Sequence, residues 1–326
     1  MNIMNNIYVK DAATASSMTF LVGELEKLDP VVRQPLSSVT YPRDVRIIRE
    51  GGWYEYLSTF NVNYGVSGGV KNLQGGIQNA IARVQADLSK DTVRTSVFQS
   101  TLSLKWIDMQ FNKMTGRNLQ QLLEDGTRLI YDKYLEQAVY FGFPNQDIHG
   151  LVNHPSVTAS SLAMNAGNTS TQWVNKTPQE ILDDVNNAIN AAWAASEYDN
   201  SAIPNHILIP PADFTLIQGT IMSVTGTIAN SSVLQYILNN NMATTLGQEL
   251  KIYPCRQCIG VGAGSTDRMI VYNDNAKFLD FQIPVEIGRI MSMWNPDTAS
   301  LDTLYAALVG AVRLHYTQPI IYKDGI

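Results

Sequence analysis

The clearest periodic pattern in the chain is a helical stripe between residues 118 and 141. Charged side chains such as Arg128, Asp132 and Glu136 alternate on the opposite face. Gly142 and Pro144 follow as a stop signal, and Gly116 can break or bend the helix upstream. At about 1.5 Å per residue the stretch spans roughly 36 Å, which predicts one long helix packed along one face. The apolar stripe consists of Leu119, Leu122, Leu123, Leu129, Ile130, Tyr134, Leu135, Ala138 and Val139.

The sequence Thr177-Pro178-Gln179-Glu180 predicts the start of a second helix. This is a capping box in which Thr177 and Glu180 satisfy each other's backbone amides, with proline at the first helical position. Apolar residues then recur at helical spacing from Ile181 to Trp193. Residues 207–209, ahead of two prolines, predict a short buried strand, and residues 231–238 predict another short helix.

Strand patterns occupy two other regions. Between residues 45 and 105, an arm rich in aromatic residues (53–64), a glycine-rich centre (65–76) and a return arm (92–104) predict a long two-stranded excursion. An isolated hairpin is marginally stable in water, so we expect it to lie on a neighbouring subunit. The alternative is an ordinary antiparallel sheet within one domain. Late in the chain, residues 250–253, 268–272 and 285–294 predict strands, and 303–316 predicts one long alternating strand.

Residues 1–45 contain small and polar residues followed by Pro30, Pro35 and Pro42, which disfavour helix. We interpret this segment as an extended arm. The alternative is a disordered terminus, which is common at chain ends.

Composition narrows the functional classes. Hydrophobic residues make up 45% of the chain and charged residues 16%. The low charged fraction favours a surface that is buried by self-assembly, because interface cores are depleted in charge. A net charge of −6 argues against a sequence-reading nucleic-acid binder but permits a wall that encloses nucleic acid. We expect no signal peptide and no membrane span, and the two cysteines indicate a reducing compartment.

Candidate chemistry is sparse. Cys255 and Cys258 have CxxC spacing, but a zinc site needs a second pair of ligands and a thioredoxin-like site needs a following helix. Gly260, Gly262 and Gly264 lack the spacing of a dinucleotide loop, so a surface loop is expected. The remaining candidates are better explained as turn packing, for His149 and His154, and as solvated helix faces, for Glu124-Asp125 and Asp183-Asp184. We therefore predict no catalytic, cofactor-binding or metal-binding residues, and no enzyme.

The order of several motifs resembles the major capsid proteins of tailed bacteriophages, whose relatives include the encapsulins. The resemblance covers residues 45–326. It rests on the long helix followed by Gly142 and the turn Gly150-Leu151-Val152-Asn153, on 177–182, on Pro204 to Pro211, on 267–272 and on the end of the chain, 319–326.

This resemblance implies an α+β fold of the Johnson type. Residues 1–45 would be the N-terminal arm and 46–104 the extended β-hairpin loop. Residues 105–155 with 276–317 would be the peripheral domain that carries the long spine helix. Residues 156–275 with 318–326 would be the axial domain.

The implied function is self-assembly as pentamers and hexamers into an icosahedral phage head that encloses double-stranded DNA without sequence-specific contacts. Portal, scaffolding and decoration proteins are the implied partners, and the location is the virion, assembled in the host cytoplasm. A lysine–asparagine cross-link, as in some relatives, would have Lys71 and Asn295 as candidates. The alternatives are an encapsulin-type nanocompartment, an enzyme with an unrecognised site, and a tail or neck protein. The long helix argues against the tail or neck protein.

Overall fold

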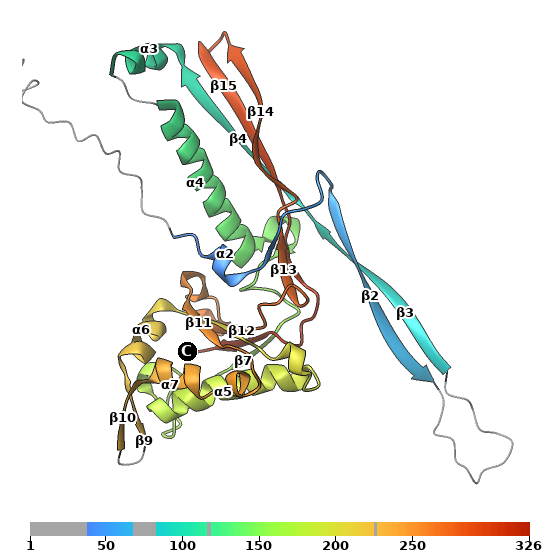
Figure 1. Ribbon diagram of the computed structural model, residues 1–326, viewed down its shortest axis with the longest axis vertical. Helices are drawn as coiled ribbons and strands as arrows, with labels where there is room; N and C mark the ends of the chain where they lie inside the picture. Colours follow the sequence, from blue (N-terminus) through green and yellow to red (C-terminus); the bar gives the residue numbers. More distant parts are fainter. Residues whose placement is uncertain (1–37, 68–82, 116–118, 225–226) are drawn as a thin grey trace, which may run out of the picture. The chain divides into compact units, whose positions relative to one another are not determined.

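A computed structural model describes residues 38–67, 83–115, 119–224 and 227–326 (Figure 1). Both helices and sheets occur along this part of the chain, and most of its strand pairs are antiparallel, which agrees with the α+β prediction. Residues 1–37, which hold most of the predicted arm, and 68–82, the centre of the predicted excursion, lie outside the described residues.

Five described strands form a mixed sheet with the order β11–β8–β12–β17–β7. The outer pairs, β11 with β8 and β17 with β7, are parallel, and the inner pairs are antiparallel. The last strand of the chain, β17, therefore lies inside the sheet rather than at its edge. The strands are β7 (Thr158–Ser161), β8 (His206–Ile209), β11 (Lys251–Pro254), β12 (Arg268–Tyr272) and β17 (Ile321–Asp324).

This sheet is buried on both faces. Successive side chains of a strand point to opposite faces, and all residues of β8 and β12 are buried. Leu208 and Ile270 belong to one hydrophobic core, and Ile207 and Met269 belong to the other. A strand that is covered on both sides reads as a continuous apolar run, which explains why residues 207–209 were predictable from sequence.

Helices pack over the second of these cores. α5 (Pro178–Ala195) begins with the predicted capping box: the Thr177 amide donates to Glu180 Oε2 at 2.6 Å, and the Glu180 amide donates to Thr177 Oγ1 at 3.4 Å. The helix contacts β12 and β17. The neighbouring short elements are η2 (Trp173–Asn175), η3 (Asn200–Ala202), α6 (Pro211–Gly219), β9 (Ile221–Val224), β10 (Thr227–Ser232), α7 (Val233–Asn239) and α8 (Met242–Thr245).

The predicted long helix is α4 (Leu119–Tyr140), preceded by α3 (Trp106–Thr115). Residues 116–118, which include the proposed break at Gly116, are not described. After α4, Gly142 adopts a positive φ of 67°, and the chain continues through β5 (Gly142–Phe143), η1 (Pro144–Gln146) and β6 (Ile148–His149). The turn is fixed by backbone bonds from Leu151 to Val139 and from Val152 to Tyr140.

A three-stranded antiparallel sheet packs against α4. Its order is β14 (Val285–Asn295), β15 (Ser300–Val309) and β4 (Ser96–Lys105). Phe98 of β4 contacts the rings of Tyr131 and Tyr134 on α4, with centroids 5.3 and 5.0 Å apart.

This sheet corrects two predictions. The return arm does not run to Leu104, because the chain divides at Thr95: β3 (Arg83–Arg94) pairs with β2 (Tyr56–Ser67), whereas β4 pairs with β15. The single strand expected over 303–316 is also wrong. It is divided at Gly310, after which β16 (Val312–Leu314) leaves β15 and pairs with β13 (Leu279–Gln282). Alternation within one stretch cannot reveal that its two halves join different sheets.

The segment before the hairpin holds α2 (Tyr41–Asp44) and β1 (Ile47–Ile48), which pairs with β13. Pro42 therefore lies in the first turn of a helix, the one place where proline is well tolerated, rather than in an extended arm.

Candidate functional site: a buried polar junction and exposed apolar strands

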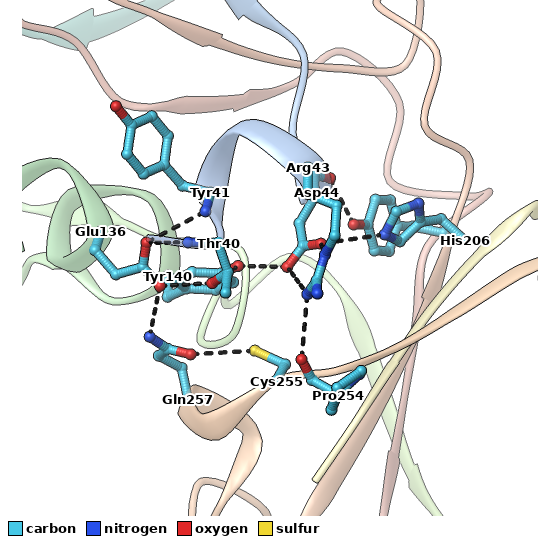
Figure 2. A network of polar contacts seen from close by, with 11 residues as sticks. Thr40, Tyr41, Arg43, Asp44, Glu136, Tyr140, His206, Pro254, Cys255 and Gln257 are labelled. Carbon is cyan, nitrogen blue, oxygen red and sulfur yellow. Dashed lines mark hydrogen bonds and ion pairs between the residues drawn. The ribbon is translucent and has the colours of Figure 1, made fainter. Parts of the chain in front are cut away.

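The start of α2 is bound to the long helix α4 through one carboxylate (Figure 2). Glu136 Oε2 accepts the backbone amides of Thr40 and Tyr41 at 2.9 and 3.2 Å, and Glu136 Oε1 accepts the Thr40 hydroxyl at 2.6 Å. Gln257 Nε2 donates to the same Oε1 at 2.9 Å. The first amides of a helix have no acceptor inside the helix, and a negative charge there is favourable. Glu136, which lies on α4, supplies both the missing acceptor and the negative charge.

The other end of α2 carries Asp44, whose side chain is fully buried. Arg43 donates to both of its carboxylate oxygens, from Nε at 2.6 Å and from Nη2 at 3.0 Å. Tyr140 of α4 donates to Oδ2, and Tyr272 of β12 donates to the Asp44 backbone carbonyl at 2.6 Å. α2 is thereby attached to the long helix and to the five-stranded sheet.

His206 of β8 completes this junction (Figure 2). Its Nε2 lies 3.5 Å from Asp44 Oδ1, an ion-pair distance rather than a hydrogen bond, and its ring contacts those of Tyr253 and Tyr272. Neither ring nitrogen has a hydrogen-bond partner within the described chain. Burial alone raises the pKa of Asp44, but the contacts with His206, Arg43 and Tyr140 outweigh burial and hold that pKa below its ordinary value.

The junction is suited to holding structure rather than to catalysis. The Asp44 carboxylate is fully buried and surrounded by donors, and burial beside Asp44 raises the pKa of Tyr140 far above its usual range. A buried, satisfied carboxylate that no substrate can approach is a poor general base. What the junction does is fix α2, the element that follows residues 1–37, against α4 and β8.

A second buried ion pair fixes the end of the chain. Arg268 of β12 donates to both carboxylate oxygens of Asp324 on β17, at 2.7 and 3.0 Å, and to the Val152 carbonyl at 2.7 Å. The guanidinium also lies over the Tyr322 ring, 4.5 Å from its centroid. The turn after α4 and the last strand are thus joined through one arginine.

The β2–β3 ribbon presents an apolar face to solvent. Even-numbered residues of β2 share a face, and Tyr64 is 76% exposed and Phe60 62% exposed. Val62 is directly opposite Leu88 of β3, so the same face continues on the second strand. We name this surface the ribbon face; it consists of Tyr56, Phe60, Val62, Tyr64 and Leu88, which are all exposed.

A further group of exposed apolar side chains lies on β14. Met291, Met293 and Trp294 are each about half exposed and border a hollow of about 380 Å³ that Pro296 and Leu304 also line. Large apolar side chains that gather on a surface mark sites of protein contact.

Comparison with known proteins identifies the family of this chain. The sequence profile described as "Major capsid protein" matches residues 69–326 of the chain, which is more than half of its length. The chain belongs to the major capsid protein family. None of the curated proteins compared with this sequence matches it.

Solved capsid structures share the fold of this capsid protein at low sequence identity. The capsid of Myoviridae phage XM1 matches with a TM-score of 0.75 and 14% identity over 93% of this chain and 97% of that one. The capsid of a native GTA particle matches with 0.63 and 8% identity over 92% and 94%. A Microbacterium phage Oxtober96 structure gives 0.59 and 11% identity over 92% and 95%. The predicted Johnson-type capsid fold is confirmed.

Within this capsid protein, the residues singled out from sequence are mostly scattered. Gly260, Gly262 and Gly264 form the expected surface loop. The rings of His149 and His154 are in edge contact with centroids 5.8 Å apart, which is the turn packing predicted for them. Asn295 ends β14 and donates to Asp302, whereas its proposed partner Lys71 lies outside the described residues.

The interpretation of Asp183-Asp184 as a solvated pair is wrong for Asp184. That carboxylate is buried, with Lys176 Nζ at 2.5 Å and Trp173 Nε1 at 3.1 Å. Helical spacing placed the residue next to an exposed aspartate but could not show that a lysine upstream of the cap folds back over it.

The described part of the capsid protein holds no group of three or more His, Cys, Asp or Glu side chains that could bind a metal ion. Its helices, searched over the same residues, include none that is long and apolar enough to cross a membrane.

Sequence reasoning missed the polar junction altogether. Thr40 and Glu136 are 96 positions apart and Tyr140 and Asp44 equally so, and no spacing rule links them. The assignment of Glu136 to the charged face of the helix, opposite the apolar stripe, is wrong: its side chain is buried, because it accepts hydrogen bonds from α2 and from Gln257.

Proposed function

We propose that this protein assembles as pentamers and hexamers into an icosahedral phage head that encloses double-stranded DNA. Family membership and the fold shared with phage capsids support the proposal. The observation that carries it is the ribbon face, an apolar surface on a two-stranded ribbon whose strands pair with each other in the described chain.

The ribbon face requires a partner on physical grounds. A two-stranded hairpin is marginally stable alone, and several exposed aromatic and aliphatic side chains on one face are costly in water. A chain that builds a shell from copies of itself meets that need with another copy. Tyr56, Phe60 and Tyr64 supply large contact areas with few rotatable bonds.

We propose the domain division that the resemblance implies, with one boundary, between the hairpin loop and the peripheral domain, moved from 104 to 95. Residues 1–45 form the arm, 46–95 the hairpin loop, 96–155 with 276–317 the peripheral domain, and 156–275 with 318–326 the axial domain. The pairing of β4 with β15 is the reason for assigning 96–104 to the peripheral domain instead of the loop.

The remaining roles follow from assembly. A net charge of −6 suits a protein shell that encloses DNA without binding it tightly, because tight binding depends on cationic contacts to phosphate. Portal, scaffolding and decoration proteins are the proposed partners of the assembled shell, which forms in the host cytoplasm and becomes part of the virion. We propose a structural rather than an enzymatic role; no described feature favours an enzyme or an encapsulin-type compartment over a phage head.

The ribbon face is tested by the double substitution Phe60→Ser with Tyr64→Ser. Both side chains are exposed in the single subunit, so we expect the thermal unfolding of the monomer to change little and shell formation to be lost. Sedimentation and electron microscopy measure the shells, and circular dichroism measures the fold. Thr59→Ser, on the other face of β2, is the matched control and should assemble normally. Normal shells from the double variant would refute the role of the ribbon face.

A further inference from the structure

The two cysteines of the chain are held next to each other in the core. β11 ends at Pro254, Cys255 caps the short 3-10 turn η4 (Arg256–Cys258), and the Cys258 amide donates to the Cys255 carbonyl at 3.4 Å. Both thiols are buried in the same hydrophobic core, and neither is in a disulfide. This i to i+3 hydrogen bond closes a turn, which places the Cα atoms of its two end residues about 6 Å apart. That separation is within the range over which a disulfide bridges two Cα atoms.

The two thiols also influence each other's surroundings. The neighbouring Cys255 side chain, together with burial, raises the pKa of Cys258. Cys255 Sγ in turn donates to Gln257 Oε1 at 3.4 Å, and Gln257 donates to Glu136 in the polar junction (Figure 2). The thiol pair therefore lies beside the contacts that fix α2.

We propose that Cys255 and Cys258 form an intramolecular disulfide when the particle leaves a reducing compartment; the timing rests on the proposed function as a virion protein. The co-reactant is a small-molecule disulfide. One cysteine, as thiolate, attacks it and releases one thiol, and the second cysteine then attacks the mixed disulfide and releases the other. The cysteine pair loses two protons and two electrons, and the small disulfide is reduced to two thiols.

Burial gives this pair a structural rather than a catalytic role. A thiol–disulfide exchange enzyme needs an exposed thiol of lowered pKa, and here both sulfurs are buried and the pKa of Cys258 is raised. Oxidation should accordingly be slow, because it requires the thiolate and local opening, and the product should resist reduction. Closing this short loop limits the unfolded chain, and we expect the melting temperature to rise by about 3 °C.

The chain offers a direct chemical test. Arg256 lies between the two cysteines, so trypsin separates residues 252–256 from 257–268. Purified full-length protein is incubated for days with oxidised glutathione, unfolded with a maleimide present and digested. We expect the two peptides to remain linked, free of maleimide, and to separate after reduction. Cys258→Ser, the control, should give separate peptides and show no rise in melting temperature on oxidation.

Two results would overturn the proposal: both cysteines still labelled by maleimide after oxidation, or glutathione adducts and links between chains in place of the internal bond. The peptide readout does not depend on shell formation. A linked pair in a protein that never assembles would count against the proposed function alone, and labelled cysteines in well-formed shells would count against the disulfide alone.

Discussion

At the scale of single residues, Asp44 is the clearest case of a charge stabilised by its surroundings. Removing a carboxylate from water is costly, and the cost is offset when donors occupy its oxygens. Arg43 and Tyr140 provide those donors, and His206 adds a nearby ring. The result is a negative charge inside the fold that binds three elements together.

Asp44→Asn should reveal this charge through the pH dependence of stability. Because the contacts hold the folded pKa of Asp44 below its ordinary value near 3.9, its contribution is present above about pH 4 and is lost as the pH falls through the folded pKa. We expect the free energy of unfolding to drop by about 2–3 kcal/mol at neutral pH. Denaturant titrations between pH 3 and pH 7 measure this loss, and the difference from the natural protein should shrink below pH 4.

Asp147→Asn provides the matched control, because Asp147 is almost fully exposed and has a left-handed conformation that asparagine adopts readily. Its unfolding free energy should stay within about 0.5 kcal/mol of the natural protein. An equal loss at both positions, or none at Asp44, would contradict the account of the junction.

Contacts between residues close in the sequence were predictable, whereas contacts between distant residues were not. The capping box of α5 was predictable because Thr177 and Glu180 are three residues apart and the motif is complete within the helix start. The junction of Asp44, Glu136 and His206 was not, because each residue looks ordinary in its own stretch and gains its role through folding. The burial of Asp184 was misjudged for the same reason.

At the scale of elements, the end of α4 depends on two close backbone approaches. A Cβ atom at Gly142 would lie 2.2 Å from the Ile148 carbonyl oxygen, and one at Gly150 would lie 2.2 Å from the Tyr140 carbonyl oxygen. No side chain can move aside to relieve either contact, because both involve backbone atoms. This turn is part of the motif by which the sequence resembled phage capsid proteins.

Gly150→Ala and Gly126→Ala should have opposite effects on stability. The first forces the turn apart and should cost more than about 2 kcal/mol. The second adds a Cβ in open space inside α4 and should stabilise the protein by about 0.5–1 kcal/mol, because alanine is the better helix former. Thermal and urea unfolding measure both. A neutral Gly150→Ala variant would show that the turn is not as tight as described.

Strand partners were harder to predict than strands. Most strands that periodicity indicated are present, but the division at Thr95 and the break at Gly310 were missed. Pairing is set by contacts with residues up to about 200 positions away, as between Ser103 and Asp302, and a single stretch carries no record of them.

At the scale of the whole molecule, one part of the described chain is well packed, whereas another part exposes large apolar side chains to solvent. The five-stranded sheet is buried between two cores, and its last strand is fixed by Arg268 and Asp324. The ribbon face and the exposed side chains of β14, by contrast, have no equivalent cover in the described residues. That contrast is what a subunit needs if it is to keep its own fold and still form an interface with other copies.

The most direct test of the central claim is electron microscopy of the purified protein, with light scattering on the same sample. A shell-forming subunit should give closed particles, or rings of five and six copies. A folded monomer of 36.1 kDa that stays single at every salt and crowding condition would contradict assembly as the property of this chain.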